Sequence, residues 1–209
     1  MNYTHSDALV TTDWLKDRIN VTGVTIVDAS FFVPGGTAPA KEKYVKEHIP
    51  GAVFFDINDI ADPDADQDHT IPSAQVFGAK VGALGINNDT MIIAYDTMGG
   101  GCAAARVWWM FKAFGHNRIA VLDGGLDRWK ANGGRLTNDK TKPRIESYIA
   151  LQEARDWVME KTDIALNIDL RRFQLVDARS TGRFEGIEPE PRPGLKSGHI
   201  PGSRNLPFS

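Results

Sequence analysis

The fold is decided by residues 175–207, LVDARSTGRFEGIEPEPRPGLKSGHIPGSRNLP, because this stretch repeats a pattern from the start of the chain. Residues 26–30 read IVDAS and residues 48–53 read HIPGAV. Both copies run from an apolar strand ending in Asp-Ala, through a polar excursion, to His-Ile-Pro-Gly, whose Pro-Gly marks a tight turn into another strand. A repeat at a separation of about 150 residues predicts two tandem domains of one design, not a short-period solenoid.

We expect the second domain to be cut short. After the first His-Ile-Pro-Gly the chain continues through a long regular pattern, whereas after the second it soon reaches Ser209. About sixty residues of an α/β domain bury too little apolar surface to fold alone. We therefore expect a first domain over 1–136, a linker over 137–150, and the N-terminal part of a second domain over 151–209, which either docks on the first domain or pairs with a companion C-terminal segment.

Composition excludes several classes of partner. The chain has 209 residues, a formal net charge of -3 and no Lys/Arg cluster that would follow phosphates, which argues against nucleic acid. It has no apolar run long enough to span a membrane, and residues 1–7 lack the features of a secretory signal, so we expect a cytoplasmic protein. Cys102 is the only cysteine, which excludes an internal disulfide and any multi-cysteine metal site.

Alternating apolar segments give the fold class. Strand patterns cover 24–29, 53–56, 91–95 and 119–122, and helix patterns cover 73–84, 102–114 and 153–161. Strands that alternate with helices over short loops predict an α/β fold with a mainly parallel sheet flanked by helices. The stretch 57–71 is rich in Asp, Asn and Pro, and long ordered loops often carry function.

Several motifs together resemble the tandem-domain rhodanese family of sulfurtransferases. They are the paired Asp-Ala and His-Ile-Pro-Gly segments, Tyr95-Asp96, ARVWWMF at 105–111 and LDGGL at 122–126. The chain is more similar to the 3-mercaptopyruvate sulfurtransferase branch than to the thiosulfate sulfurtransferase branch. The resemblance implies that the first domain is a non-catalytic copy and that the second is of the catalytic type, lacking its active loop here.

The family's chemistry is a sulfur transfer. A cysteine thiolate takes the sulfane sulfur of 3-mercaptopyruvate or thiosulfate as a persulfide and passes it to cyanide or to a thiol acceptor, such as a thioredoxin-like protein. Backbone N–H groups at a helix N-terminus favour such a thiolate. The resemblance places the nucleophilic cysteine beyond Ser209, and it implies no cofactor and no metal.

Two arginines are the candidate substrate-binding residues. By resemblance, Arg183 and Arg192 match two substrate-anchoring arginines of the mercaptopyruvate branch. Arginine suits a 2-keto acid because its planar fork holds a carboxylate by two charge-assisted hydrogen bonds. The alternative is that either arginine pairs with Glu185, Glu188 or Glu190 and only stiffens the loop.

Asp56 and His69 are the candidate catalytic residues of the first domain. The resemblance implies that they reach toward the active loop, where the histidine relays a proton and the carboxylate orients it. Asp68 is an equal candidate for the orienting acid, and a solvated surface histidine is the simpler reading of His69.

Three other residues need an interpretation. His48 and His199 occupy the twin turns, so we expect the same structural hydrogen bond in each copy rather than a metal pair. Cys102 follows three glycines at a helix start, but Trp108, not arginine, stands six residues later, which disfavours a rhodanese-like phosphatase. We read Cys102 as a half-buried packing residue. Two alternatives to a sulfurtransferase site in the second copy stay open: a non-catalytic anion-binding module, and Cys102 itself as a sulfur carrier.

Overall fold

The computed structural model describes residues 7–31, 39–152, 157–191 and 194–208. The chain divides into two compact units, Met1–Trp157 and Val158–Ser209.

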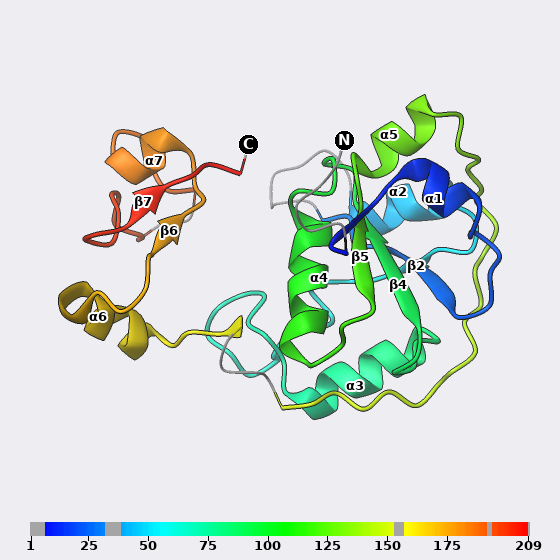
Figure 1. Cartoon of the computed structure of the whole chain (residues 1–209), viewed down its shortest axis with the longest axis horizontal. Helices are drawn as coiled ribbons and strands as arrows, with labels where there is room; N and C mark the ends of the chain where they lie inside the picture. Colours follow the sequence, from blue (N-terminus) through cyan, green and yellow to red (C-terminus); the bar gives the residue numbers. More distant parts are fainter. Residues whose placement is uncertain (1–6, 32–38, 153–156, 192–193, 209) are drawn as a thin grey trace. The chain divides into compact units, whose positions relative to one another are not determined.

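The first unit is built on a five-stranded sheet, all of whose strands pair in parallel (Figure 1). Its order is β1-β5-β4-β2-β3. The strands are β1 Leu9–Val10, β2 Val24–Asp28, β3 Val53–Phe54, β4 Met91–Tyr95 and β5 Ile119–Leu122. The predicted α/β fold with a mainly parallel sheet is therefore confirmed.

The central strand β4 shows why its continuous apolar run forms a buried strand. Successive side chains of a strand point to opposite faces. Ile92 and Ala94 belong to one buried cluster, whereas Ile93 and Tyr95 belong to the other. Because helices cover both faces, neither set of side chains reaches water.

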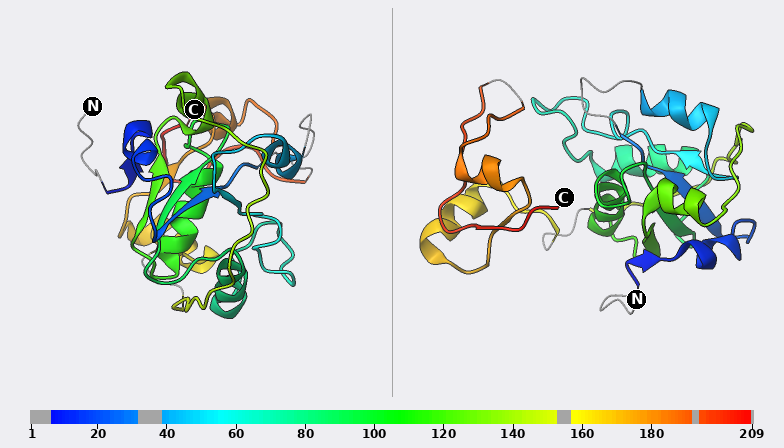
Figure 2. Two further views of the ribbon diagram at one scale, coloured as in Figure 1. Left: turned by 90° about the vertical axis from the view of Figure 1, so that its right-hand side faces the viewer. Right: turned by 90° about the horizontal axis from the view of Figure 1, so that it is seen from above.

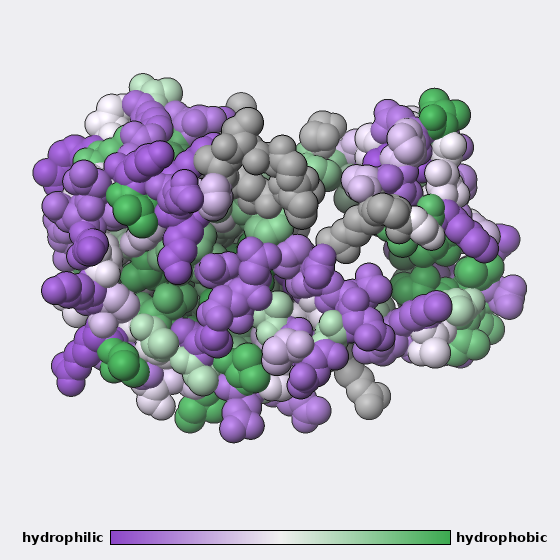
Figure 3. Space-filling model, turned by 180° about the vertical axis from the view of Figure 1, so that it is seen from behind, coloured by the Kyte–Doolittle hydropathy of each residue, from purple (hydrophilic) through white to green (hydrophobic). Residues whose placement is uncertain are grey.

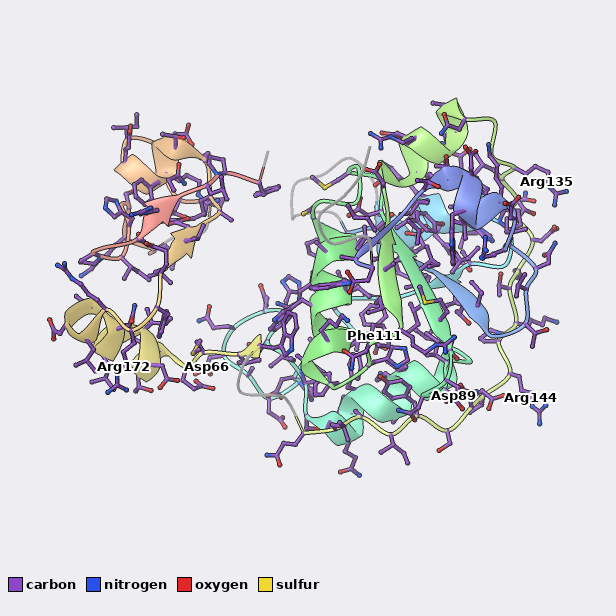
Figure 4. All side chains as sticks on the ribbon, viewed as in Figure 1. Asp66, Asp89, Phe111, Arg135, Arg144 and Arg172 are labelled. Atoms are coloured by element: carbon purple, nitrogen blue, oxygen red, sulfur yellow. The ribbon has the colours of Figure 1, made fainter. Side chains whose placement is uncertain are left out.

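The helices of this unit flank the sheet (Figure 2). They are α1 Thr12–Lys16, α2 Ala40–Lys46, α3 Ala74–Ala83, α4 Ala103–Ala113 and α5 Gly125–Ala131. On one face α3 and α4 pack together, with the rings of Phe77 and Phe111 edge-on at 5.2 Å. Figure 4 labels Phe111 on α4. Leu15 of α1 and Trp129 of α5 fill the cluster on the other face.

The stretch predicted as a linker packs against α3. The backbone N–H of Glu146 donates to Gly82 O at 3.0 Å, and Tyr148 is buried in the core. A Cβ on Gly82 would lie 2.4 Å from Glu146 O, so this close approach requires glycine. By the contact division, this stretch belongs to the first unit.

The second unit contains α6 Lys161–Leu170, β6 Val176–Asp177, α7 Thr181–Glu185 and β7 Arg204–Asn205, with β6 and β7 paired in parallel. The predicted helix over 153–161 is wrong for residues 158–160, which are not helical; Trp157 lies in a 3₁₀ turn, and residues 153–156 lie outside the described residues. The helix starts instead at Lys161, because Glu160 and Asp163 form a capping box there.

The second unit has little core of its own. Among its described residues no apolar side chain is buried, and apolar side chains gather on its surface (Figure 3). The exposed ones include Leu166, Ile168, Leu170, Val176, Ile187, Leu195, Ile200, Leu206 and Phe208. A two-stranded sheet with this much open apolar surface is marginally stable. None of the helices in the described ranges combines the length and hydropathy needed to cross a bilayer.

Candidate functional site

The twin His-Ile-Pro-Gly turns have the same local structure in both units. His48 Nδ1–H donates to Tyr44 O at 2.6 Å, and its ring stacks on Tyr44 with centroids 4.2 Å apart. His199 Nδ1–H donates to Phe184 O at 2.8 Å, and its ring stacks on Phe184 at 3.8 Å. The prediction of one shared structural hydrogen bond is confirmed. Within the described ranges no three His, Cys, Asp or Glu side chains are grouped to hold a metal.

A carboxylate joins two arginines in the second unit. The side chain of Glu190 is only 4% exposed. Its Oε1 accepts from Arg179 Nη1 at 2.7 Å, and its Oε2 accepts from Arg183 Nη2 at 2.5 Å and Arg183 Nε at 3.2 Å. The hydrogen bond from Arg183 lowers the pKa of Glu190, which keeps the carboxylate charged.

Arg179 is held from its other side as well. Its Nε donates to Asp177 Oδ1 at 3.0 Å, and its Nη2 donates to Gly198 O at 2.7 Å. The hydrogen bond from Arg179 lowers the pKa of Asp177. Arg179 is not among the residues predicted for the site, although it directly follows the Asp-Ala of the second copy. The two guanidinium groups are thus fixed by charge-assisted hydrogen bonds before any ligand arrives.

The structure places only one of the two predicted substrate arginines. Arg183 pairs with Glu190, one of the partners that the sequence analysis left open. Its side chain is still 29% exposed, and its Nη1 makes no hydrogen bond to any described residue. Arg192 lies outside the described residues. Arg183 can therefore offer part of its fork to an anion while Glu190 fixes the rest.

His69 lies on the loop after β3, where its ring binds Asn58 rather than Asp56. The His69 Nε2 to Asn58 Oδ1 distance is 2.8 Å, and Phe31 packs edge-on to the imidazole at 4.9 Å. Asp56 Oδ1 accepts instead from the backbone N–H of Asn58 at 3.1 Å. No hydrogen bond between Asp56 and His69 exists in the described part of the loop, so the carboxylate orients the loop backbone and not the imidazole.

Asn58 is the functional candidate that the sequence analysis missed. A short Asp-x-Asn motif was visible, and Asp side chains commonly bind the backbone two residues on. The loop contact to His69 spans eleven residues without any periodicity, so no pattern could reveal it. An open pocket of about 450 Å³ adjoins these groups and is lined by Phe31, Asn58, Asp68, His69 and their loop neighbours.

The backbone N–H groups of the loop before α4 bind a carboxylate from the same loop, that of Asp96. Asp96 is fully buried, and its Oδ1 accepts from the backbone N–H groups of Met98 and Gly100, both at 2.8 Å. Its Oδ2 accepts from the N–H of Ala104 at 2.9 Å. Burial, and next the charge of Asp96, raise the pKa of the Cys102 thiol. Since the thiolate is the nucleophile, Cys102 is poorly suited to carry sulfur.

Comparison with known proteins identifies the family of this chain. The model of the rhodanese-like domain matches residues 11–132. The chain is 39% identical over 207 residues to a 3-mercaptopyruvate sulfurtransferase of Homo sapiens, covering 97% of this chain and 69% of that protein. It is 41% identical over 207 residues to a thiosulfate sulfurtransferase of Cricetulus griseus, covering 96% of this chain and 69% of the relative.

A solved structure is similar over nearly the same span. The crystal structure of SseA from Escherichia coli, described as a 3-mercaptopyruvate sulfotransferase with the rhodanese fold, superposes with a TM-score of 0.84 at 32% identity. The match covers 95% of this chain and 74% of SseA.

Proposed function

Since this chain belongs to the rhodanese family of sulfurtransferases, we propose that it moves the sulfane sulfur of 3-mercaptopyruvate, or of thiosulfate, to a thiol or cyanide acceptor through a cysteine persulfide. Relatives of both kinds match at similar identity, so identity alone does not choose the donor. We favour 3-mercaptopyruvate because its carboxylate suits the guanidinium of Arg183, whose Nη1 is not used by Glu190.

The observation that carries this proposal is the nearly buried Glu190 carboxylate bound to Arg179 and Arg183. Arg183 loses little side-chain entropy when an anion binds, because Glu190, itself held by Arg179, already orders its guanidinium. In this proposal Arg183 anchors the donor's carboxylate and Arg192 shares that role. His69 relays a proton at the reacting sulfur, and Asp56 shapes the loop that carries it.

The nucleophile of this proposal is not Cys102. The thiol has a raised pKa, and Asp96 takes the backbone N–H groups that would stabilise a thiolate in the same loop. We propose that a companion C-terminal segment supplies the cysteine and covers the apolar surface of residues 158–209. The twin histidine turns support the second unit as the N-terminal part of a second rhodanese domain.

The direct test supplies a companion segment from a relative and measures sulfur transfer. The chain is co-expressed with the part of SseA that the match does not cover, and pyruvate and thiocyanate are measured with 3-mercaptopyruvate and cyanide. Arg183→Met should lower kcat/KM by about 10- to 100-fold, because a charge-assisted hydrogen bond contributes about 1.5–3 kcal/mol. Arg172→Met, at an exposed arginine of the same unit (Figure 4), should leave kcat/KM unchanged.

A second candidate is an anion-binding module without transfer, which the occupied Asp96 loop and the unsuited Cys102 favour. It predicts binding of 3-mercaptopyruvate to the complemented protein with no pyruvate release. A thioredoxin-like acceptor and a cytoplasmic location stay predictions; the name of one similar protein of Arabidopsis thaliana includes "mitochondrial".

A further inference from the structure

The backbone of His69 is held in an unfavourable conformation. Its φ is 62°, in the left-handed region that residues other than glycine rarely adopt. Such a conformation costs on the order of 1–3 kcal/mol and persists only where neighbouring groups impose it. The neighbours of His69 should therefore include a group that fixes its backbone.

Arg106 of α4 fixes the backbone. Its Nη2 donates to the carbonyl oxygen of His69 at 2.5 Å, and its guanidinium lies over the ring of Trp109, 4.7 Å from the centroid. Burial lowers the pKa of Arg106, and its buried Nε has no partner among the described residues. A desolvated guanidinium makes a strong hydrogen bond, so it ties the loop to the rigid helix.

Asn58 fixes the ring and its protonation. The atom of Asn58 that faces His69 Nε2, at 2.8 Å, is the amide oxygen Oδ1, which can only accept a hydrogen bond; this orientation of the amide corresponds to a proton on Nε2. In a neutral imidazole with Nε2–H, the other nitrogen, Nδ1, keeps its lone pair. Phe31, packed edge-on, restricts rotation of the ring.

We propose that Asn58 and Arg106 are positioning residues that hold His69 as the Nε2–H tautomer and leave Nδ1 as the nitrogen that accepts a proton. The inference rests on the proposed function, in which His69 relays a proton near the donor's sulfur. It goes beyond that function by naming the reacting atom and by replacing Asp56 with Asn58 as the residue that orients the imidazole.

The first test is ¹⁵N NMR of the histidine side chains in the 209-residue chain. The chain has five histidines, and His69→Gln assigns the signals of His69. At neutral pH we expect the Nε2–H tautomer and a visible Nε2–H proton, because the hydrogen bond slows its exchange with water. Asn58→Asp, which keeps an oxygen acceptor, should retain the proton signal, and Asn58→Leu should lose it.

Two outcomes of that test overturn the proposal. One is an Nδ1–H tautomer in the wild-type chain, and the other is an unchanged Nε2–H signal in Asn58→Leu. Asn58 is exposed, so neither of its variants should prevent folding. The NMR comparison of the Asn58 variants therefore tests the proposal even if Arg106 variants fail to fold.

The second test follows the backbone. Arg106→Met should remove the left-handed chemical-shift signature of His69, whereas Arg128→Met, a control on α5, should leave it in place. A left-handed signature that survives Arg106→Met would show that Arg106 does not position the loop.

Turnover of the complemented enzyme separates this inference from the proposed function. Asn58→Leu should lower kcat by about tenfold or more with little change in KM, and Asn58→Asp should recover part of the loss. If the NMR results hold but His69→Gln leaves turnover unchanged, the relay is wrong and the positioning stands. If His69→Gln abolishes turnover while the NMR results fail, the function stands and this inference falls.

Discussion

Replacing Asp96 by alanine should destabilise the first unit more than any surface change. The substitution removes three hydrogen bonds to backbone N–H groups at 2.8, 2.8 and 2.9 Å, two of which are buried. A buried donor left without a partner costs about 1–3 kcal/mol. Partial relief by water at the third donor brings the expected loss to about 4 kcal/mol, a large share of the 5–15 kcal/mol typical of a folded domain.

Urea unfolding followed by tryptophan fluorescence measures this loss. All five tryptophans lie within Met1–Trp157, so the signal reports the first unit alone. With a slope of about 2 kcal/mol/M, the midpoint of Asp96→Ala should fall by about 2 M. The midpoint of Asp96→Asn should fall by less than that of Asp96→Ala. Its amide oxygen can still accept from the N–H groups of Met98 and Gly100, while its NH₂ group faces the N–H of Ala104.

The control for Asp96 is Asp89→Ala, at an exposed aspartate in the turn before β4 (Figure 4). We expect it to change the free energy of unfolding by less than about 0.5 kcal/mol. If Asp96→Ala stays within about 1 kcal/mol of the wild-type chain, the three donors do not depend on the carboxylate and the reasoning is refuted.

Two further predictions concern the first unit. Gly82→Ala should release residues 144–150 from α3, because its Cβ would lie 2.4 Å from Glu146 O. Hydrogen exchange should then show faster exchange of the Glu146 amide, which donates to Gly82 O in the wild-type chain. An unchanged exchange rate of this amide would contradict the packing. Burial raises the pKa of Asp28, so its stabilising contribution is present below the ordinary pKa of about 3.9 and is lost as pH rises through the raised folded-state value. The free energy of unfolding of Asp28→Asn should therefore change less with pH between about 4 and 7 than that of the wild-type chain. If both proteins show the same dependence on pH, groups other than Asp28 cause it.

The sequence predicted the three central strands of the first unit well because each is a continuous apolar run between turn residues, whereas the two-residue edge strand β1 was missed and β3 ends at Phe54 instead of residue 56. The predicted strands 91–95 and 119–122 match β4 and β5. The helix after Ser73 was also predicted, since the Ser73 hydroxyl caps it by accepting from Val76 N. Local chemistry determined all three elements, so they could be read without knowledge of the fold.

The second unit and the site were harder to predict. The helix α6 was misplaced because its capping box uses Glu160 and Asp163 instead of a Ser or Thr cap. For Arg183, the sequence offered three glutamate partners, and only the path of the loop selects Glu190. The link between His69 and Asn58 depends on two loop segments meeting, which no local preference encodes.

Sulfur transfer by the complemented chain tests the central claim most directly. With 3-mercaptopyruvate and cyanide, the account predicts pyruvate and thiocyanate in equal amounts, with kcat/KM reduced by Arg183→Met and not by Arg172→Met. A complemented protein that is folded and binds the donor, yet releases neither product, would contradict the account and leave an anion-binding module.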